Sequence, residues 1–155
     1  MSKIKPGKPV PDFRVAATGG RTLSLADFRG HPVVLYFYPK DDTPGCTAEG
    51  CAFRDHHAAF RQHGAIVLGV SRDTSASHEK FRARHGFPFD LLADADETLC
   101  RLFGVIQEKN MYGRKVMGIE RSTFLIDGEG VLRQEWRKVR VEGHVEAVLA
   151  AVGAL

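Results

Sequence analysis

The segment Val33–Tyr38, VVLYFY, constrains the fold more than any other part of the chain. It is rich in β-branched and aromatic residues and is apolar at both odd and even positions, which predicts a strand buried on both faces of a sheet. A second apolar segment, Ile66–Val70, has the same character, and a helical pattern from about Thr43 to His63 separates the two. This alternation of buried strands and a helix predicts a central sheet covered by helices.

The remaining patterns extend this alternation along the chain. We expect two short strands around the Gly19-Gly20 turn and no regular period over Gly104–Gly118, which predicts a long connection there. The other expected elements are a helix over Ser75–His85, a strand over Phe89–Ala93, a helix over Ala95–Phe103, a strand over Ile119–Asp127 in a hairpin with Val131–Val139, and a helix over His144–Leu155. This order predicts an α/β fold with a mixed sheet, helices on both faces, and a single domain over residues 1–155.

Composition and charge exclude several classes of protein. With 155 residues, 43% hydrophobic and 26% charged, the chain suits one globular domain, and its net charge of +3 is scattered, so no nucleic-acid surface is predicted. The start is interrupted by Pro6, Pro9 and Pro11 and lacks the apolar core of a signal peptide, and the apolar runs are too short to span a membrane. We therefore expect a cytoplasmic, reducing setting. There, three cysteines indicate catalysis, redox sensing or metal binding rather than a disulfide scaffold.

Two of the cysteines follow the first buried strand. If Cys46 lies in the first turn of the helix, positions spaced by four and three share its inner face; these are Cys46, Gly50, Phe53, His57 and Phe60. Phe53 and Phe60 then pack on the sheet, and Cys46 points inward at the edge where α/β sheets place their sites. The free N–H groups and partial positive charge of a helix N-terminus favour the thiolate of Cys46.

Thiolate formation alone does not make an enzyme. A thiol with a pKa of about 8.5 is roughly 3% ionised at pH 7, and lowering that pKa to about 6 raises the ionised fraction about 30-fold. Enzymes typically accelerate reactions by about 10⁶-fold or more. If Cys46 is a nucleophile, other groups must therefore orient the substrate and stabilise charge. The hydroxyl of Thr43 and the backbone N–H groups of Gly45 and Cys46 are local candidates, and a buried arginine from elsewhere would complete the set.

The spacing between Cys46 and Cys51 conflicts with a disulfide in an intact helix. Residues five apart on a helix lie about 140° apart around its axis, with Cα atoms roughly 8.6 Å apart, whereas a disulfide needs about 4.4–6.8 Å. Either the two cysteines never bond or the first turns unwind, and Gly45 and Gly50 lower the cost of unwinding. The alternative for any helical cysteine is plain packing, and this is our interpretation of Cys100, which lies among Leu99, Leu102 and Phe103.

The segment Phe37–Asp55, FYPKDDTPGCTAEGCAFRD, resembles the active-site segment of Q-type peroxiredoxins, also called bacterioferritin comigratory proteins. The family motif Pro-x-x-x-Thr/Ser-x-x-Cys falls on Pro39, Thr43 and Cys46, and a second cysteine five positions later, here Cys51, is the mark of the Q type. Two further stretches agree with the resemblance: PGKPVPDF near the start, and GIERSTFLIDGEG, which places the family's active-site arginine at Arg121. The resemblance covers nearly the whole chain.

The resemblance implies a thioredoxin-like fold and a thiol peroxidase that uses no metal, haem or flavin. It implies that Cys46 attacks hydrogen peroxide or an alkyl hydroperoxide and becomes a sulfenic acid. Thr43 and Arg121 would contact thiolate and peroxide, and Pro39 would shield the pocket. Cys51 would then form an intrachain disulfide, which a thioredoxin-type partner reduces. The family type also suggests a monomer.

Other polar residues near the motif receive simpler interpretations. Asp41 and Asp42 are expected to be solvated loop residues, and Glu49, Arg54 and Asp55 are expected to form a surface set in which Arg54 braces the helix. His56 and His57 point about 100° apart on a helix, so they are a poor pair for one metal ion.

Two other functions compete with the peroxidase. A thiol–disulfide oxidoreductase on the same fold would usually carry Cys-x-x-Cys, whereas four residues separate the cysteines here. A redox-sensing binding module or holdase would need a long exposed apolar patch or a charged tail, and the sequence indicates neither. Peroxide consumption in the presence of thioredoxin and NADPH distinguishes the three.

Overall fold

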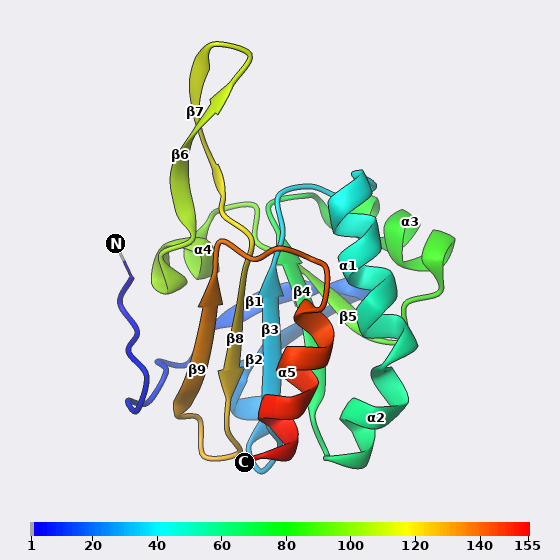
Figure 1. The fold of residues 1–155 in the computed structure, drawn as a ribbon, viewed down its shortest axis with the longest axis vertical. Helices are drawn as coiled ribbons and strands as arrows, with labels where there is room; N and C mark the ends of the chain where they lie inside the picture. Colours follow the sequence, from blue (N-terminus) through cyan, green and yellow to red (C-terminus); the bar gives the residue numbers. More distant parts are fainter. Residues whose placement is uncertain (1) are drawn as a thin grey trace.

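The computed structural model describes residues 2–155, and it contains the predicted central sheet. Seven strands lie in the order β2-β1-β5-β4-β3-β8-β9, and these strands alternate with helices along the chain (Figure 1). Their bounds are β1 Arg14–Ala17, β2 Arg21–Ser24, β3 Val33–Phe37, β4 Ile66–Ser71, β5 Asp90–Ala93, β8 Ser122–Ile126 and β9 Leu132–Arg137. β3, β4 and β5 are parallel, and the other pairings are antiparallel, so the sheet is mixed as predicted.

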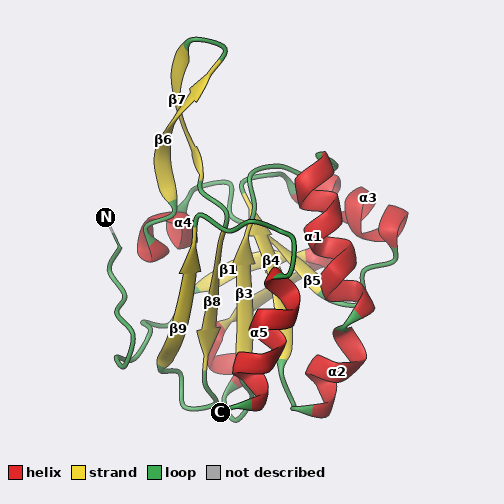
Figure 2. Ribbon diagram, viewed as in Figure 1, coloured by secondary structure: helices red, strands yellow, loops and turns green. Residues whose placement is uncertain are grey.

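Helices cover both faces of the sheet, but unequally (Figure 2). One face packs against α1 Pro44–Asp55, α2 His57–Gln62, α3 Ser75–His85 and α5 His144–Gly153. The other face is covered by α4 Thr98–Phe103, by the 3₁₀ helix η2 Leu25–Phe28 and by the N-terminal segment. The alternate residues of β3 divide between the two cores, Val34 and Tyr36 facing one and Leu35 and Phe37 the other, which confirms that this strand is buried on both sides.

Two expectations about local structure are wrong. The helical pattern from Thr43 to His63 is broken at His56, which lies between the last residue of α1, Asp55, and the first residue of α2, His57. Gly104–Gly118 is not an irregular connection, because β6 Ile106–Met111 and β7 Arg114–Ile119 form an antiparallel hairpin that projects from the body (Figure 1). The hairpin escapes detection because most of its outer residues are exposed and polar on both faces, so it has no apolar alternation.

None of the helices in residues 2–155 combines the length and the apolar character needed to cross a membrane.

Candidate active site

Cys46 lies where the sequence places it, in the first turn of α1. β3 ends at Phe37, a short loop follows, and Thr43 takes an extended conformation before Pro44 opens the helix. Pro44 suits the first helical position because its missing N–H has no intrahelical partner there. The side chain of Cys46 points into the core beside β3, and the residue is only 2% exposed. The thiol therefore sits at a helix N-terminus and largely out of water.

Arg121 reaches this thiol from the segment between β7 and β8. Its Nη2 donates to the Sγ of Cys46 at 3.4 Å, and its Nη1 donates to the Oε1 of Glu49 at 2.7 Å. Gly45 leaves room for this approach, because a Cβ at that position would lie 3.0 Å from Nη2 of Arg121 and the guanidinium would have to shift slightly. Arg121, 75 positions from Cys46 in sequence, is thus the buried arginine from elsewhere in the chain that a nucleophilic Cys46 needs.

Glu49 is the site residue that sequence reasoning missed. It is fully buried rather than part of a surface set, and burial raises the pKa of its carboxyl to about 7 although Arg121 opposes that rise. Within the described part of the chain, its Oε2 has no hydrogen-bond partner. The signal was present in the spacing: Glu49 lies three residues after Cys46 and one before Gly50, on the inward face of α1. Arg54 does brace the helix, donating from Nη1 to the carbonyl of His85 at 2.8 Å.

Thr43 and Pro39 lie in the segment that connects β3 to α1, and the hydrogen bond of the Thr43 side chain does not go to the thiol. The Thr43 hydroxyl donates to the carbonyl oxygen of Lys40 at 2.9 Å, so the lone pairs of its oxygen stay available to accept a hydrogen bond. Pro39 is half-buried in the loop after β3. The structure thus joins Cys46 to Arg121 by a hydrogen bond and leaves Thr43 and Pro39 as flanking residues.

Asp41 is a buried anchor, not a solvated loop residue as expected. Its carboxylate accepts hydrogen bonds from Tyr38 Oη at 2.6 Å, Ser77 Oγ at 2.7 Å and His78 Nδ1 at 2.8 Å. The Nε2 of His78 lies 2.9 Å from the carbonyl oxygen of Leu92, so both ring nitrogens of His78 contact oxygen atoms. Burial raises the pKa of Asp41, but hydrogen bonds from His78 and Tyr38 outweigh it and lower the pKa overall. The active-site loop is thereby fixed to α3.

Asp42, the next residue in this loop, is exposed as expected and pairs with Arg84 and His85 on α3.

Cys51 lies on the same unbroken helix as Cys46 but is only half-buried, as its position around the helix predicts. Neither thiol is bonded, so this is the reduced form of the pair. Gly50 between them has a packing role that the sequence did not reveal, because a Cβ there would lie 2.4 Å from Cζ of Phe87. Unwinding this helix must separate Gly50 from Phe87 and Glu49 from Arg121.

Cys100 is a core residue, as interpreted from sequence. Its side chain is fully buried, and burial together with the neighbouring Asp94 raises the pKa of the thiol far above its ordinary value. A thiol held neutral in this way is a poor nucleophile.

His56 and His57 take no part in a metal-like cluster. Among the described residues, the donor atoms that come together are those of Asp41, Asp73 and His78, within 4.8 Å of one another. These atoms already bond to protein groups: Asp73 Oδ2 accepts from the backbone N–H of Asp41 and from the hydroxyl of Ser71. The cluster serves as a loop anchor.

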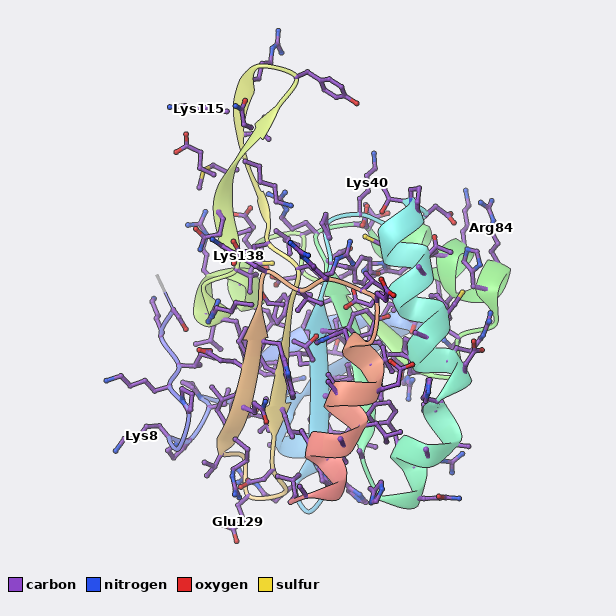
Figure 3. The ribbon with its side chains drawn as sticks, in the orientation of Figure 1. Lys8, Lys40, Arg84, Lys115, Glu129 and Lys138 are labelled. Carbon is purple, nitrogen blue, oxygen red and sulfur yellow. The ribbon has the colours of Figure 1, made fainter. Side chains whose placement is uncertain are left out.

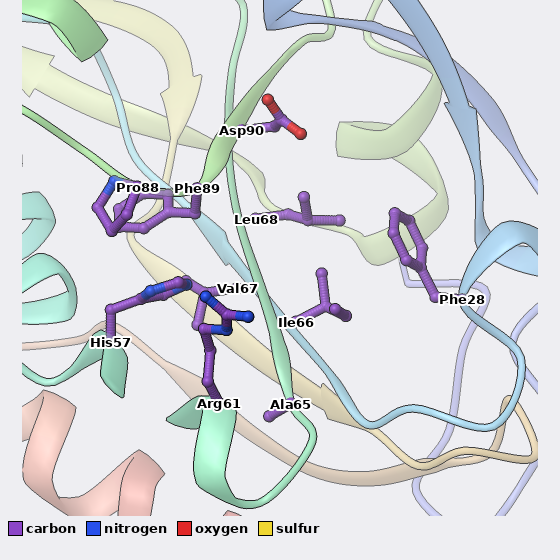
Figure 4. Close-up of a pocket in the computed structure, with 10 residues that line it drawn as sticks. All are labelled: Phe28, His57, Arg61, Ala65, Ile66, Val67, Leu68, Pro88, Phe89 and Asp90. Carbon is purple, nitrogen blue, oxygen red and sulfur yellow. The ribbon is translucent and has the colours of Figure 1, made fainter. Parts of the chain in front are cut away.

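A pocket of about 320 Å³ lies away from Cys46 (Figure 4). It is lined by the start of β4, Ile66 to Leu68, together with His57, Arg61 and Phe89. Because β3 and β4 are parallel and Cys46 follows the end of β3, this pocket and the thiol lie at opposite ends of the strands.

Comparison with known proteins decides the family. The sequence profile of the AhpC/TSA family matches residues 6–135. The chain belongs to that family. Peroxiredoxin Bcp of Xanthomonas campestris is 54% identical over 143 residues, 92% of this chain and 89% of the relative, and Peroxiredoxin Bcp of Bacillus subtilis is 49% identical over 146 residues, 94% and 93%. The predicted Q-type peroxiredoxin resemblance is confirmed, and with it the peroxidase activity.

Solved structures agree with this assignment. Peroxiredoxin Q of Xanthomonas campestris superposes with a TM-score of 0.88 at 54% identity and covers 92% of this chain and 90% of its own. A cysteine-to-serine mutant of PrxQ from Xylella fastidiosa gives a TM-score of 0.93 at 43% identity, covering 99% and 98%. The predicted thioredoxin-like α/β fold is therefore confirmed.

Proposed function

We propose that Cys46 is the peroxidatic cysteine of a hydroperoxide reductase. The observation that carries the proposal is the contact between Arg121 Nη2 and Cys46 Sγ at 3.4 Å, made at a helix N-terminus and out of water. The thiolate attacks the terminal oxygen of the hydroperoxide, the O–O bond breaks, and the departing alkoxide takes up a proton to leave as alcohol or water. Cys46 becomes a sulfenic acid. The guanidinium stabilises negative charge on sulfur and on the leaving oxygen.

Three neighbours assist this step. Glu49 fixes the guanidinium of Arg121 through Nη1, while Nη2 of the same group contacts the thiol. Thr43 has free lone pairs that can accept the O–H of a bound hydroperoxide. Pro39, half-buried in the loop after β3, shields the pocket from bulk water.

Cys51 acts as the resolving cysteine in this proposal. Its thiol attacks the sulfenic sulfur of Cys46, forms the disulfide and releases water. Both residues lie within one continuous helix, and residues five apart there are roughly 8.6 Å apart at Cα. The disulfide therefore requires α1 to unwind, which breaks the contacts of Glu49 with Arg121 and of Gly50 with Phe87. The helix has a folded reduced state and an unwound oxidised state.

The substrates and partners follow from this cycle. We assign hydrogen peroxide and alkyl hydroperoxides as substrates, and a related solved structure concerns alkyl peroxide reduction by the Xanthomonas campestris bacterioferritin comigratory protein. A thioredoxin-type dithiol restores both cysteines. An intrachain disulfide needs no second subunit, which supports a monomer whose residues 1–155 form one peroxiredoxin domain.

Peroxide consumption coupled to thioredoxin, thioredoxin reductase and NADPH tests the proposal. Wild-type protein should turn over, Cys46→Ser should not, and Cys51→Ser should reduce one equivalent of peroxide and then fail to recycle. Cys100→Ala is the matched control, because Cys100 lies on the buried face of α4 and should be dispensable for turnover. Full turnover by Cys46→Ser would reject the assignment.

A further inference from the structure

The β6–β7 hairpin stands beside the proposed active site. Its second strand ends at Ile119, and Arg121, which contacts Cys46, follows two residues later. Its base is tied to the body where Arg72, just after β4, donates to the carbonyl oxygen of Met117 at 3.4 Å. Figure 1 shows the hairpin rising from the same end of the molecule as the loop between β3 and α1. The hairpin therefore lies at the end of the molecule that carries Cys46.

The tip of the hairpin carries an aromatic residue that local folding does not favour. Tyr112 and Gly113 are the two loop residues, and both have positive φ, 52° and 79°. Such a two-residue turn favours Asn-Gly, and a left-handed conformation costs an ordinary residue roughly 1–2 kcal/mol. The Tyr112 side chain is also completely exposed. Backbone strain and an exposed aromatic at one position indicate a functional requirement for that side chain.

Exposed apolar side chains concentrate on this hairpin. Among residues 2–155, excluding the side chain of Met111, the large hydrophobic residues exposed to solvent are Tyr112, Val116, Met117 and Leu155, and only Leu155 lies elsewhere. A free two-stranded hairpin is marginally stable in water. An apolar surface on such a hairpin fits a binding arm, because tyrosine and methionine are enriched at protein interfaces.

The hairpin carries a net positive charge. Lys109, Arg114 and Lys115 outnumber the one carboxylate, Glu108, which pairs with Lys115 at 3.6 Å. Lys40 after β3 and Lys138 after β9 project from the same end of the molecule (Figure 3). Two copies of the chain would bring like charges together here, which disfavours self-association through this surface. An acidic partner fits instead.

We propose that the hairpin surface formed by Tyr112, Val116, Met117, Arg114 and Lys115 is the docking arm for an acidic dithiol reductant protein. The inference rests on the proposed function, which requires a protein dithiol to reach the Cys46–Cys51 disulfide. Because the hairpin flanks the site of that disulfide, a reductant seated against it presents its thiols to the unwound segment of α1. The apolar residues supply contact area, and the cations attract the partner and orient it.

The electron transfer in the docked complex balances without another reactant. A thiolate of the reductant attacks one sulfur of the Cys46–Cys51 disulfide, which gives a mixed disulfide and frees the other sulfur. The second thiol of the reductant then attacks the mixed disulfide. The reductant leaves as a disulfide, and its two electrons and two protons reside on Cys46 and Cys51.

A comparison of two reductants tests the arm. Peroxidase turnover is measured with an acidic thioredoxin and, separately, with dithiothreitol, which is too small to use a docking surface. Tyr112→Asn removes the ring and places a favoured residue in the turn, so the hairpin stays folded. We expect the ratio of thioredoxin-supported to dithiothreitol-supported kcat/KM to fall about tenfold, which is the typical effect of removing one anchor residue from a protein interface. Arg114→Glu should lower the same ratio, most strongly at low salt.

Leu155→Ser is the matched control, since it removes an exposed apolar residue away from the hairpin and should leave the ratio unchanged. An unchanged ratio in both hairpin variants would overturn the proposal. So would a concentration-dependent dimer in wild-type protein that Tyr112→Asn abolishes, because the hairpin would then bind a second copy. Equal absence of turnover with both reductants in wild type would instead reject the proposed function.

Discussion

Glu49, a fully buried carboxyl, accepts a hydrogen bond at 2.7 Å from Arg121, the residue that also donates to the thiol of Cys46. One guanidinium therefore divides its charge between a carboxyl and the proposed nucleophile. The arrangement makes the environment of Cys46 depend on whether Glu49 carries a proton, since a neutral carboxyl leaves more of the positive charge to the sulfur.

Glu49 should leave a signature in the pH dependence of stability. Its folded-state pKa of about 7 lies above its usual value of 4.5, so its contribution to stability is full below pH 4.5 and is lost as pH rises towards 7. The loss approaches about 1.4 kcal/mol per pH unit across that window. His144, whose pKa is lowered to about 4 by burial, acts in the opposite sense, so wild type must be compared with Glu49→Gln. Urea unfolding at pH 5 and pH 8 should show a smaller loss in the variant, and equal losses would contradict this account.

Arg121 should be needed for reactivity rather than for binding of the reductant. Arg121→Lys keeps a charge but cannot donate to Glu49 and Cys46 with the paired nitrogens of a guanidinium. We expect kcat/KM for peroxide to fall about 10²–10³-fold. Single-turnover oxidation of Cys46 followed by stopped flow measures this step directly, and a loss seen only in the KM for thioredoxin would place Arg121 elsewhere in the cycle.

Gly50→Ala should destabilise the reduced form. The added Cβ would lie 2.4 Å from the ring of Phe87, so the ring or the helix must move, at a cost of about 1–3 kcal/mol. Adding Phe87→Leu should recover most of the stability that Gly50→Ala loses. Thermal unfolding of the single and double variants measures this recovery. Alanine favours a helix over glycine by about 1 kcal/mol, so helix propensity acts against the expected loss. No recovery in the double variant would show that the contact with Phe87 is not its cause.

Two neighbouring aspartates allow a matched test of the loop anchor. Asp41→Asn removes a buried carboxylate that accepts hydrogen bonds from Tyr38, Ser77 and His78, and leaving such donors poorly satisfied typically costs about 1–3 kcal/mol or more. Asp42→Asn makes the same chemical change at an exposed position and should cost less than about 1 kcal/mol. Chemical unfolding of both variants measures the difference, and equal stabilities would show that Asp41 does not anchor the loop.

The sequence predicts the parts of this protein that depend on local pattern. β3 and the position of Cys46 follow from apolar runs and helix spacing, both of which are properties of short segments. The environment of Asp41 could not be predicted, because its partners Ser77 and His78 lie on α3 and meet it only after the sheet forms. The β6–β7 hairpin lacks a buried face over most of its length, so no hydrophobic period marked it. The burial of Glu49 could have been predicted, because its position on the helix faces inward, but its charge favoured an exposed position.

In the proposed cycle, α1 unwinds each time the Cys46–Cys51 disulfide forms. Hydrogen exchange at the backbone amides of residues 45–55, compared between reduced and peroxide-oxidised protein with the disulfide mapped by peptide analysis, tests it most directly. We expect a Cys46–Cys51 disulfide together with a loss of amide protection across this segment. A Cys46–Cys51 disulfide with unchanged protection, or a Cys46–Cys100 disulfide as the main product, would contradict it.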